Sequence, residues 1–208
     1  MTDIIAKDFF AEDYIGDRED MLRSIELLQI ELDNFVNQHA EEDLQEAPFE
    51  VQNEVGYLLY TLGKDFYMIG EYATAAEYFE TGLAFNLNTK DLYVMEMVKA
   101  YGLSLLNSNQ GRSGIVLEAV YDDFCDSADF CFIMGLVYRE QRQYEQAVIE
   151  FAKATQQKED AIAGSNSYLS YYYAGQCREE QNRNEEARDF YRKAQNYEPA
   201  RERLARLG

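Results

Sequence analysis

Three segments of this 208-residue chain carry the same pattern of small and aromatic residues at the same spacing. The anchors of the pattern are Gly63, Gly135 and Gly175. Twelve residues after the anchors stand Ala75, Ala147 and Ala187, and sixteen residues after them stand Phe79, Phe151 and Tyr191. Nineteen residues after them stand Gly82, Ala154 and Ala194. Such a recurrence at fixed spacing indicates internal structural repeats.

The spacing predicts that each repeat is a hairpin of two antiparallel helices. The anchor glycine lets the first helix approach the second, where the alanine accepts the contact, and the aromatic residue fills the space before the next hairpin. A glycine inside a helix costs about 1 kcal/mol relative to alanine, so three glycines in register indicate close helix packing.

These hairpins resemble the tetratricopeptide repeat family, which often has a proline where Pro199 follows the last hairpin. The large residue that the family places four positions before the small one appears as Leu59, Cys131 and Tyr171. The resemblance implies an all-α fold, a right-handed superhelical solenoid of antiparallel helix hairpins, and a role in binding other polypeptides.

We expect the repeats over residues 48–208, with hairpins at about 49–88, 90–124, 127–158 and 166–197 and a polar capping helix from Pro199. The second hairpin is degenerate, and two alignments remain open. One anchors on Gly102 and places Glu118 in the aromatic position, whereas the other anchors on Ser104 and places Val116 and Val120 in the core.

Residues 1–47 are predicted to be a separate acidic part that consists of an arm and an amphipathic helix over 18–39. The apolar face of that helix comprises Leu22, Ile25, Leu28, Leu32, Phe35 and Val36. The arm carries the apolar residues Ile4, Ile5, Phe9, Phe10, Tyr14 and Ile15. Residues 1–16 are therefore predicted to occupy the chain's own groove or that of a second copy, as in a homodimer. A disordered terminus is the alternative.

The formal net charge of −20 limits the classes of partner. Residues 1–54 alone contain 16 acidic and three basic residues. Nucleic acids and anionic membrane surfaces are disfavoured because they repel such a polyanion, while a basic protein or peptide is compatible. The sequence shows no signal peptide, no candidate membrane span and no CxxC pair among its three cysteines, so a cytoplasmic location with reduced thiols is expected.

No pattern of catalytic residues is visible, and neither enzymatic activity nor a cofactor is expected. His39 is the only histidine, and no partners stand at the spacing of a metal site or a nucleophile–base pair. The glycine-containing segment 111–114 lacks the lysine of a phosphate-binding loop.

Tyrosine is abundant, with 17 residues, whereas tryptophan is absent. In the resembled family the first helix of each hairpin faces a concave groove, which implies a peptide-binding set. Its members are Tyr57, Tyr60, Lys64, Tyr67, Lys99, Leu103, Phe132, Leu136, Arg139, Leu169, Tyr172, Tyr173 and Gln176. Tyrosine suits recognition because it combines a large contact area with a polar group. Packing between helices is the alternative for each residue, since core aromatics share this spacing. The family's carboxylate clamp for peptide C-termini is not reproduced.

A narrower resemblance covers the C-terminal half, which is similar to the tetratricopeptide segment that follows the catalytic domain of some bacterial family 2 glycosyltransferases. The matching segments are Ala128-Asp129-Phe130, Gly135-Leu136-Val137-Tyr138, residues 166–172 and residues 196–204. The catalytic domain itself has no counterpart here. The leading interpretation is a non-catalytic adaptor that binds a peptide or protein segment. The alternatives are an accessory module of a bacterial glycosyltransferase system and a peptide-sensing regulator.

Overall fold

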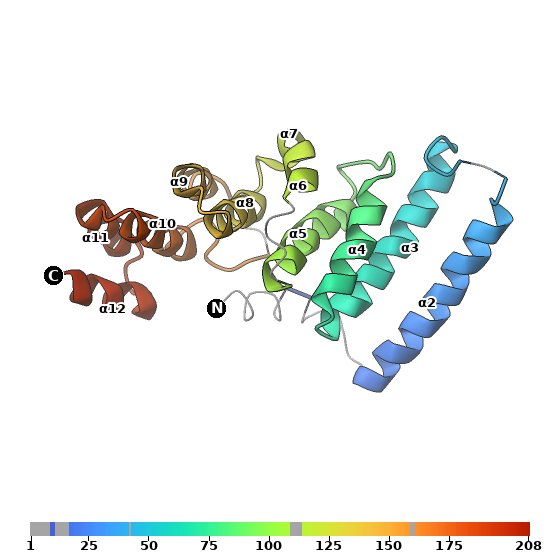
Figure 1. Ribbon diagram of the computed structural model, residues 1–208, viewed down its shortest axis with the longest axis horizontal. Helices are drawn as coiled ribbons and strands as arrows, with labels where there is room; N and C mark the ends of the chain where they lie inside the picture. The colour runs from blue at the N-terminus through green and yellow to red at the C-terminus, as the bar shows by residue number, and fades with distance from the viewer. Residues whose placement is uncertain (1–8, 11–16, 42, 109–113, 159–160) are drawn as a thin grey trace. The chain divides into compact units, whose positions relative to one another are not determined.

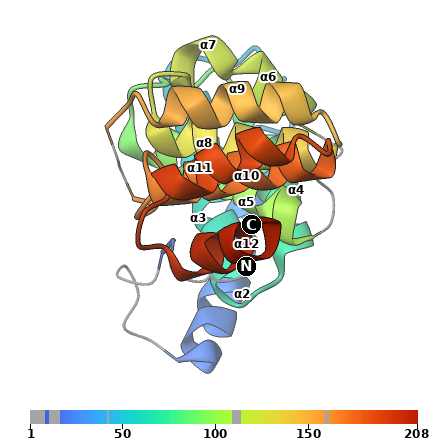
Figure 2. The same cartoon turned by 90° about the vertical axis from the view of Figure 1, so that its left-hand side faces the viewer.

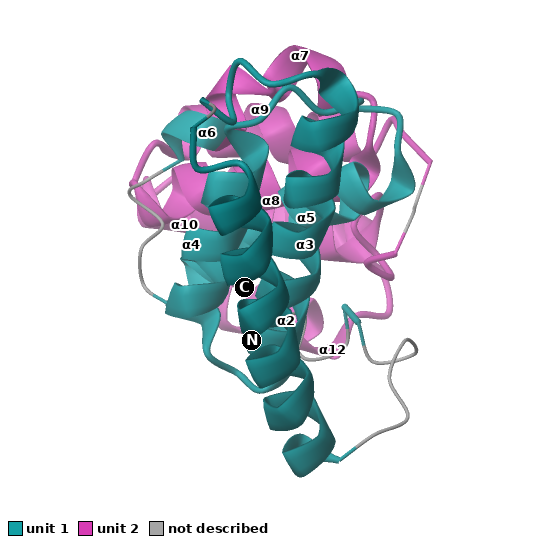
Figure 3. Ribbon diagram, turned by 90° about the vertical axis from the view of Figure 1, so that its right-hand side faces the viewer, with its two compact units in different colours: residues 1–116 teal, residues 117–208 magenta. Residues whose placement is uncertain are grey.

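The computed structural model describes residues 9–10, 17–41, 43–108, 114–158 and 161–208. Over these residues the chain forms eleven helices and no strand (Figure 1). The predicted all-helical architecture is therefore confirmed. The chain divides into two compact units, residues 1–116 (unit 1) and residues 117–208 (unit 2), which are coloured separately in Figure 3. The predicted boundary between residues 47 and 48 lies inside unit 1.

Unit 1 contains four long helices, and α6 (Ile115–Ala119) begins at its end. The four are α2 (Arg18–Gln38), α3 (Phe49–Met68), α4 (Tyr72–Leu83) and α5 (Leu92–Asn107). Helix α3 packs against α2, α4 and α5, and α4 packs against α5 (Figure 1). Asp17 begins α2 with a capping box: its side chain accepts hydrogen bonds from the backbone N–H groups of Glu19 and Asp20, and its own backbone N–H donates to the carboxylate of Asp20.

Helix α2 is amphipathic, as its pattern predicts, but its apolar face is only partly covered. Ile25 and Phe35 are buried, and Leu28 and Leu32 pack against the core formed by Phe35 and α3. Leu22 and Val36, which the sequence pattern places on the buried face, are instead exposed. Leu27 and Ile30 are also exposed, so one side of α2 has apolar residues in contact with solvent.

Unit 2 contains two regular hairpins followed by a terminal helix (Figure 2). Its helices are α7 (Tyr121–Phe124), α8 (Ala128–Glu140), α9 (Tyr144–Ala154), α10 (Tyr168–Glu180), α11 (Asn184–Lys193) and α12 (Glu198–Leu207). Helix α8 pairs with α9, α10 pairs with α11, and α9 packs against α10. The guanidinium of Arg178 on α10 lies 2.8 Å from the carboxylate of Glu145 on α9, which adds an ion pair between the hairpins.

The three anchor glycines each face an aromatic ring of the second helix. A Cβ built on Gly63 would lie 2.5 Å from a ring carbon of Phe79, and a Cβ on Gly135 would lie 2.6 Å from one of Phe151. A Cβ on Gly175 would lie 2.5 Å from a ring carbon of Tyr191. The predicted close approach is thus present, but the ring sixteen residues on, rather than the alanine twelve residues on, is what meets the glycine. Any side chain at these positions would have to displace a buried ring.

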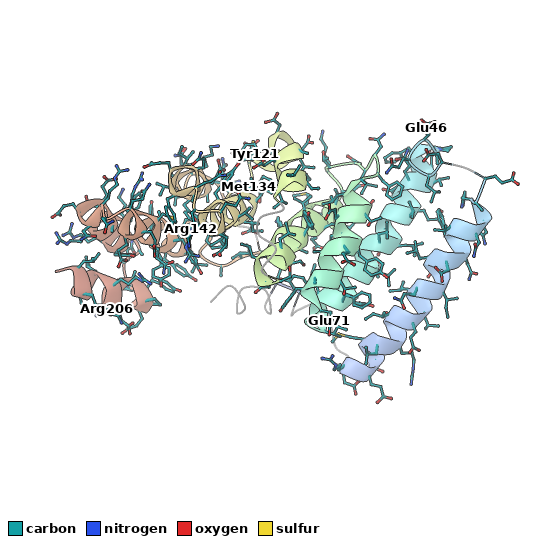
Figure 4. All side chains as sticks on the ribbon, viewed as in Figure 1. Glu46, Glu71, Tyr121, Met134, Arg142 and Arg206 are labelled. Atoms are coloured by element: carbon teal, nitrogen blue, oxygen red, sulfur yellow. The ribbon has the colours of Figure 1, made fainter. Side chains whose placement is uncertain are left out.

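The hairpin turns share a left-handed residue seven positions after each anchor glycine. These residues are Gly70, Arg142 and Asn182, with φ of 86°, 62° and 59° (Arg142 is labelled in Figure 4). Each turn also carries a backbone hydrogen bond that reaches back five residues, such as Gln143 N–H to Tyr138 O at 2.8 Å. Glycine and asparagine tolerate this backbone conformation, whereas arginine is strained in it.

The degenerate hairpin over residues 90–124 follows neither of the two alignments. Its first helix is α5, but two short helices, α6 and α7, stand where a single second helix is expected. Leu117 is fully buried there, while Val116 and Val120 are half-buried and Glu118 is exposed. The buried residue of α6 is therefore one that neither alignment selects.

Two of the three cysteines are buried among apolar residues. Cys131 and Cys177 are inaccessible to solvent, and burial raises the pKa of each thiol to about 12. Cys125 is half-buried. Cys125 is thus the one cysteine of the three whose thiol is accessible to solvent.

Gly135→Ala tests the glycine–ring contact. In an ordinary helix this change stabilises by about 1 kcal/mol, but here we expect a loss of about 1–3 kcal/mol because the new Cβ overlaps the Phe151 ring. Urea unfolding would measure the change. Phe151→Leu made in the Gly135→Ala background should recover part of the lost stability. The double variant should therefore be more stable than the sum of the two single changes predicts. A Gly135→Ala variant more stable than the parent would contradict the contact.

Arg142→Gly tests the turn. We expect stabilisation by about 0.5–1 kcal/mol, because removal of left-handed strain exceeds the added flexibility of the unfolded chain. The matched control is Gln141→Gly at the adjacent right-handed position (φ −76°), which should destabilise by a similar amount. The two midpoints of urea unfolding should therefore move in opposite directions at unchanged m-value.

Thiol titration tests the cysteine environments. At about pH 8 an aromatic disulfide reagent should label one thiol of the native protein quickly, and all three only after unfolding. The fast thiol should disappear in Cys125→Ser. If Cys125→Ser keeps a fast-reacting thiol, Cys131 or Cys177 is more accessible than its burial indicates.

Candidate functional site

Four residues of the predicted peptide-binding set lie along one face of α3. Tyr57, Tyr60, Lys64 and Tyr67 follow one another at intervals of three or four residues, which places them on the same side of a helix. Their exposure differs greatly. Tyr57 is 53% exposed, Lys64 is half-buried, and Tyr60 and Tyr67 are buried.

Tyr57 is held in place by two neighbouring tyrosine rings. Its ring centroid lies 6.0 Å from that of Tyr60 and 5.3 Å from that of Tyr93 on α5, and the rings of Tyr60 and Tyr93 are 5.6 Å apart. The hydroxyl of Tyr93 donates a hydrogen bond to Asn53 Oδ1 at 2.7 Å, and that of Tyr60 donates to the carboxylate of Glu96. Burial raises the pKa of Tyr93 to about 12, so its hydroxyl stays a neutral donor. Tyr57 is thus an exposed ring on a rigid aromatic base.

A pocket of about 490 Å³ opens beside Tyr57, between α2 and α3. Its lining residues are Leu28, Glu31, Glu50, Asn53, Glu54, Tyr57, Leu58 and Thr61. A second pocket, of about 300 Å³, shares Glu31, Glu54 and Leu58 with the first. It is completed by Leu27, Ile30, Asn34, Phe35 and Gln38. The residues that line the two pockets are called the α2–α3 surface below.

The α2–α3 surface combines exposed apolar groups with carboxylates. Leu27 and Ile30 are 63% and 58% exposed, and with Tyr57 they are the exposed apolar side chains of this surface. Its charged lining residues are Glu31, Glu50 and Glu54, and all three are acidic. A ligand that fits would offer apolar side chains together with positive charge.

The remaining members of the predicted set are not gathered on this surface. Lys99 is buried within α5, and Lys64 lies beside the ring of Phe10. Seven members belong to unit 2, and of these only Arg139 is more than slightly exposed. The buried six are Phe132, Leu136, Leu169, Tyr172, Tyr173 and Gln176.

In unit 2 these residues form contacts between the two hairpins. The ring of Tyr173 lies 5.7 Å from that of Phe132 and 6.0 Å from that of Phe151, and the guanidinium of Arg139 lies 5.4 Å from its centroid. Packing therefore accounts for these residues in the structure. Their participation in binding stays a prediction.

A pocket in unit 2 was missed by the sequence reasoning. It has a volume of about 440 Å³ and is lined by Ser167, Tyr168, Tyr171, Lys193, Ala194, Gln195, Asn196 and Tyr197. The run of tyrosines at the start of α10 is the signal that could have pointed to it. Periodicity assigns these residues to helix packing and gives no reason to expect a gap there.

Two negative observations bear on the chemistry of the site. In the described ranges, no cluster of three or more His, Cys, Asp or Glu side chains is arranged to hold a metal ion. No helix in the same part of the chain combines the length and hydrophobicity needed to cross a bilayer.

Comparison with known proteins agrees with the hairpin architecture. Two tetratricopeptide repeat family models match residues 128–160, which contain the α8–α9 hairpin, and residues 169–200, which contain all but the first residue of the α10–α11 hairpin. No curated protein matches the chain. The narrower resemblance to the glycosyltransferase-linked segment stays a prediction.

Two solved structures of MamA have a similar fold. One, described as "MamA RS-1 ArsTM double mutant", is 17% identical, with a TM-score of 0.56 over 90% of this chain and 98% of that chain. The other, MamA 41-end from Desulfovibrio magneticus RS-1, is also 17% identical, with a TM-score of 0.55 over 93% of this chain and 98% of that chain. At this identity the similarity concerns the fold alone.

Proposed function

We propose that this tetratricopeptide repeat chain is a non-catalytic protein-interaction module that binds a basic segment of another protein on the α2–α3 surface. Tetratricopeptide repeats mediate protein–protein interactions, and the proposal assigns this general role to a particular surface of unit 1. Tyr57 is its apolar anchor, and the neighbouring glutamates select for positive charge.

The observation that carries the proposal is the position of Tyr57. A tyrosine that is half exposed and fixed between Tyr60 and Tyr93 offers a large contact area with little loss of side-chain entropy on binding. Aromatic residues of this kind, beside a pocket that accepts a partner's side chain, dominate the free energy of many protein interfaces. The adjacent pocket of about 490 Å³ supplies that space.

The charge of the surface supports a basic partner. Glu31 and Glu54 line both pockets and Glu50 lines the larger one, so a lysine or arginine of a bound segment would find a carboxylate beside either pocket. Electrostatic complementarity of exposed groups acts mainly on association rate and on partner choice, while the apolar contacts supply affinity. Leu27 and Ile30 favour a segment in which apolar residues recur at helical spacing.

A binding experiment with a defined probe tests the proposal. The probe is a fluorescent peptide with leucines at every third and fourth position and lysines elsewhere, and its counterpart replaces each lysine with glutamate. Fluorescence anisotropy should show binding of the lysine peptide only. Tyr57→Ala should weaken it about tenfold, which corresponds to about 1.4 kcal/mol.

The matched control is Ile149→Ala, which removes a similarly exposed apolar side chain from α9 in unit 2 and should leave affinity unchanged. Raising the salt concentration should weaken binding to the parent, because the charged groups are exposed. Equal binding of the two peptides, or an unchanged affinity of Tyr57→Ala, would contradict the proposal.

A further inference from the structure

Phe9 and Phe10 lie against the C-terminal end of α3. The ring of Phe10 is 5.3 Å from that of Tyr67 in an edge-to-face arrangement, and the ring of Phe9 is 6.4 Å from the same tyrosine. The ammonium of Lys64 lies 4.9 Å from the centroid of the Phe10 ring. Phe10 is only 2% exposed. A pair of adjacent phenylalanines thus occupies a site formed by α3.

The site is aromatic on the protein side as well. The ring of Tyr67 contacts that of Tyr72, the first residue of α4, at 5.2 Å. Lys64, Tyr67 and Tyr72 are called the Lys64–Tyr67 site. It offers an aromatic wall and one cation, so it suits a ligand that presents ring faces to the cation and ring edges to the tyrosines.

With Phe9 and Phe10 in place, the hydroxyl of Tyr67 has no hydrogen-bond partner among the described residues. Tyr67 is 2% exposed. Burial raises the pKa of this hydroxyl far above its usual value, so it remains a neutral donor that lacks an acceptor. A buried donor of this kind costs free energy that a ligand with a suitably placed oxygen would recover.

We propose that the Lys64–Tyr67 site binds segments with two adjacent aromatic residues flanked by carboxylates, and that Phe9-Phe10 is its resident occupant from the same chain. In the sequence, Asp8 precedes the resident pair, and Glu12 and Asp13 follow it closely. A competing segment has the same aromatic pair with flanking acids. It binds more tightly if one of its oxygens accepts a hydrogen bond from the Tyr67 hydroxyl. The unsatisfied hydroxyl makes the resident pair an exchangeable occupant.

The inference does not depend on the proposed function. Tyr57 lies near the middle of α3, whereas Tyr67 lies ten residues further on at its C-terminal end, and the two surfaces prefer ligands of opposite charge. Loss of binding at one surface therefore leaves the other testable.

Removal of the resident pair in the full-length chain tests the proposal. The variant carries Phe9→Ala and Phe10→Ala, and the probe is a fluorescent peptide with the sequence of residues 3–15. We expect the peptide to bind this variant at least tenfold more tightly than it binds the parent, because the resident pair no longer competes. The same peptide with both phenylalanines changed to alanine should not bind.

Two further variants separate this result from an unspecific effect. Phe49→Ala removes an exposed phenylalanine at the start of α3, away from the site, and should behave like the parent. Adding Lys64→Gln to the double alanine variant should weaken peptide binding severalfold, because the cation above the ring is lost. If the double alanine variant is folded by circular dichroism but binds the peptide no better than the parent does, the proposal is wrong.

A single tryptophan reports the resident contact directly, since the chain contains no other tryptophan. Phe10→Trp should show the blue-shifted emission of a buried indole, and an excess of the unlabelled peptide should shift the emission to the red. Emission of a solvent-exposed indole before any addition would overturn the assignment. So would a blue shift that disappears on dilution, because the occupant would then come from a second copy.

Discussion

The contact between a glycine and an aromatic ring is the constraint on which the regular hairpins depend. In three hairpins a carbon of the ring sixteen residues after the glycine lies 2.5–2.6 Å from where a Cβ would be, so the ring packs directly against the glycine backbone. A short turn joins the two helices, and the residue seven positions after the glycine reverses the chain there with a left-handed backbone. Arg142 shows the strength of the constraint, because that turn keeps its left-handed geometry even with a residue that is strained in it.

Close packing also explains why so few predicted groove residues are accessible. First helices α8 and α10 pack against their own second helices, and α10 also packs against the preceding α9. Phe132, Tyr172 and Tyr173 are buried in these contacts. Helix α3 differs because two pockets remain between it and its neighbour α2. The ring of Tyr57 consequently remains half exposed on a base of other tyrosines.

Helix α3 therefore carries both proposed surfaces, and one helical stripe connects them. Tyr57 lies beside glutamates and suits a basic segment, whereas Lys64 and Tyr67 hold two phenylalanines from an acidic part of the sequence. Because the two surfaces favour opposite charges, one helix can discriminate between two kinds of segment. Specificity of this sort depends on repulsion of the wrong partner as much as on attraction of the right one.

The sequence by itself determined the helical hairpins, because their spacing is a local property. Gly63, Gly135 and Gly175 and the rings sixteen residues later identify each hairpin without knowledge of its surroundings. Tertiary structure alone decided which apolar residues are buried, since the same periodicity describes Tyr57 and Tyr67, yet only one is exposed. It also decided that Leu117 is the buried residue of α6 and that Phe9 and Phe10 contact Tyr67 of α3. These outcomes depend on contacts between residues distant in sequence, whereas a repeat pattern reflects only the spacing of residues within one hairpin.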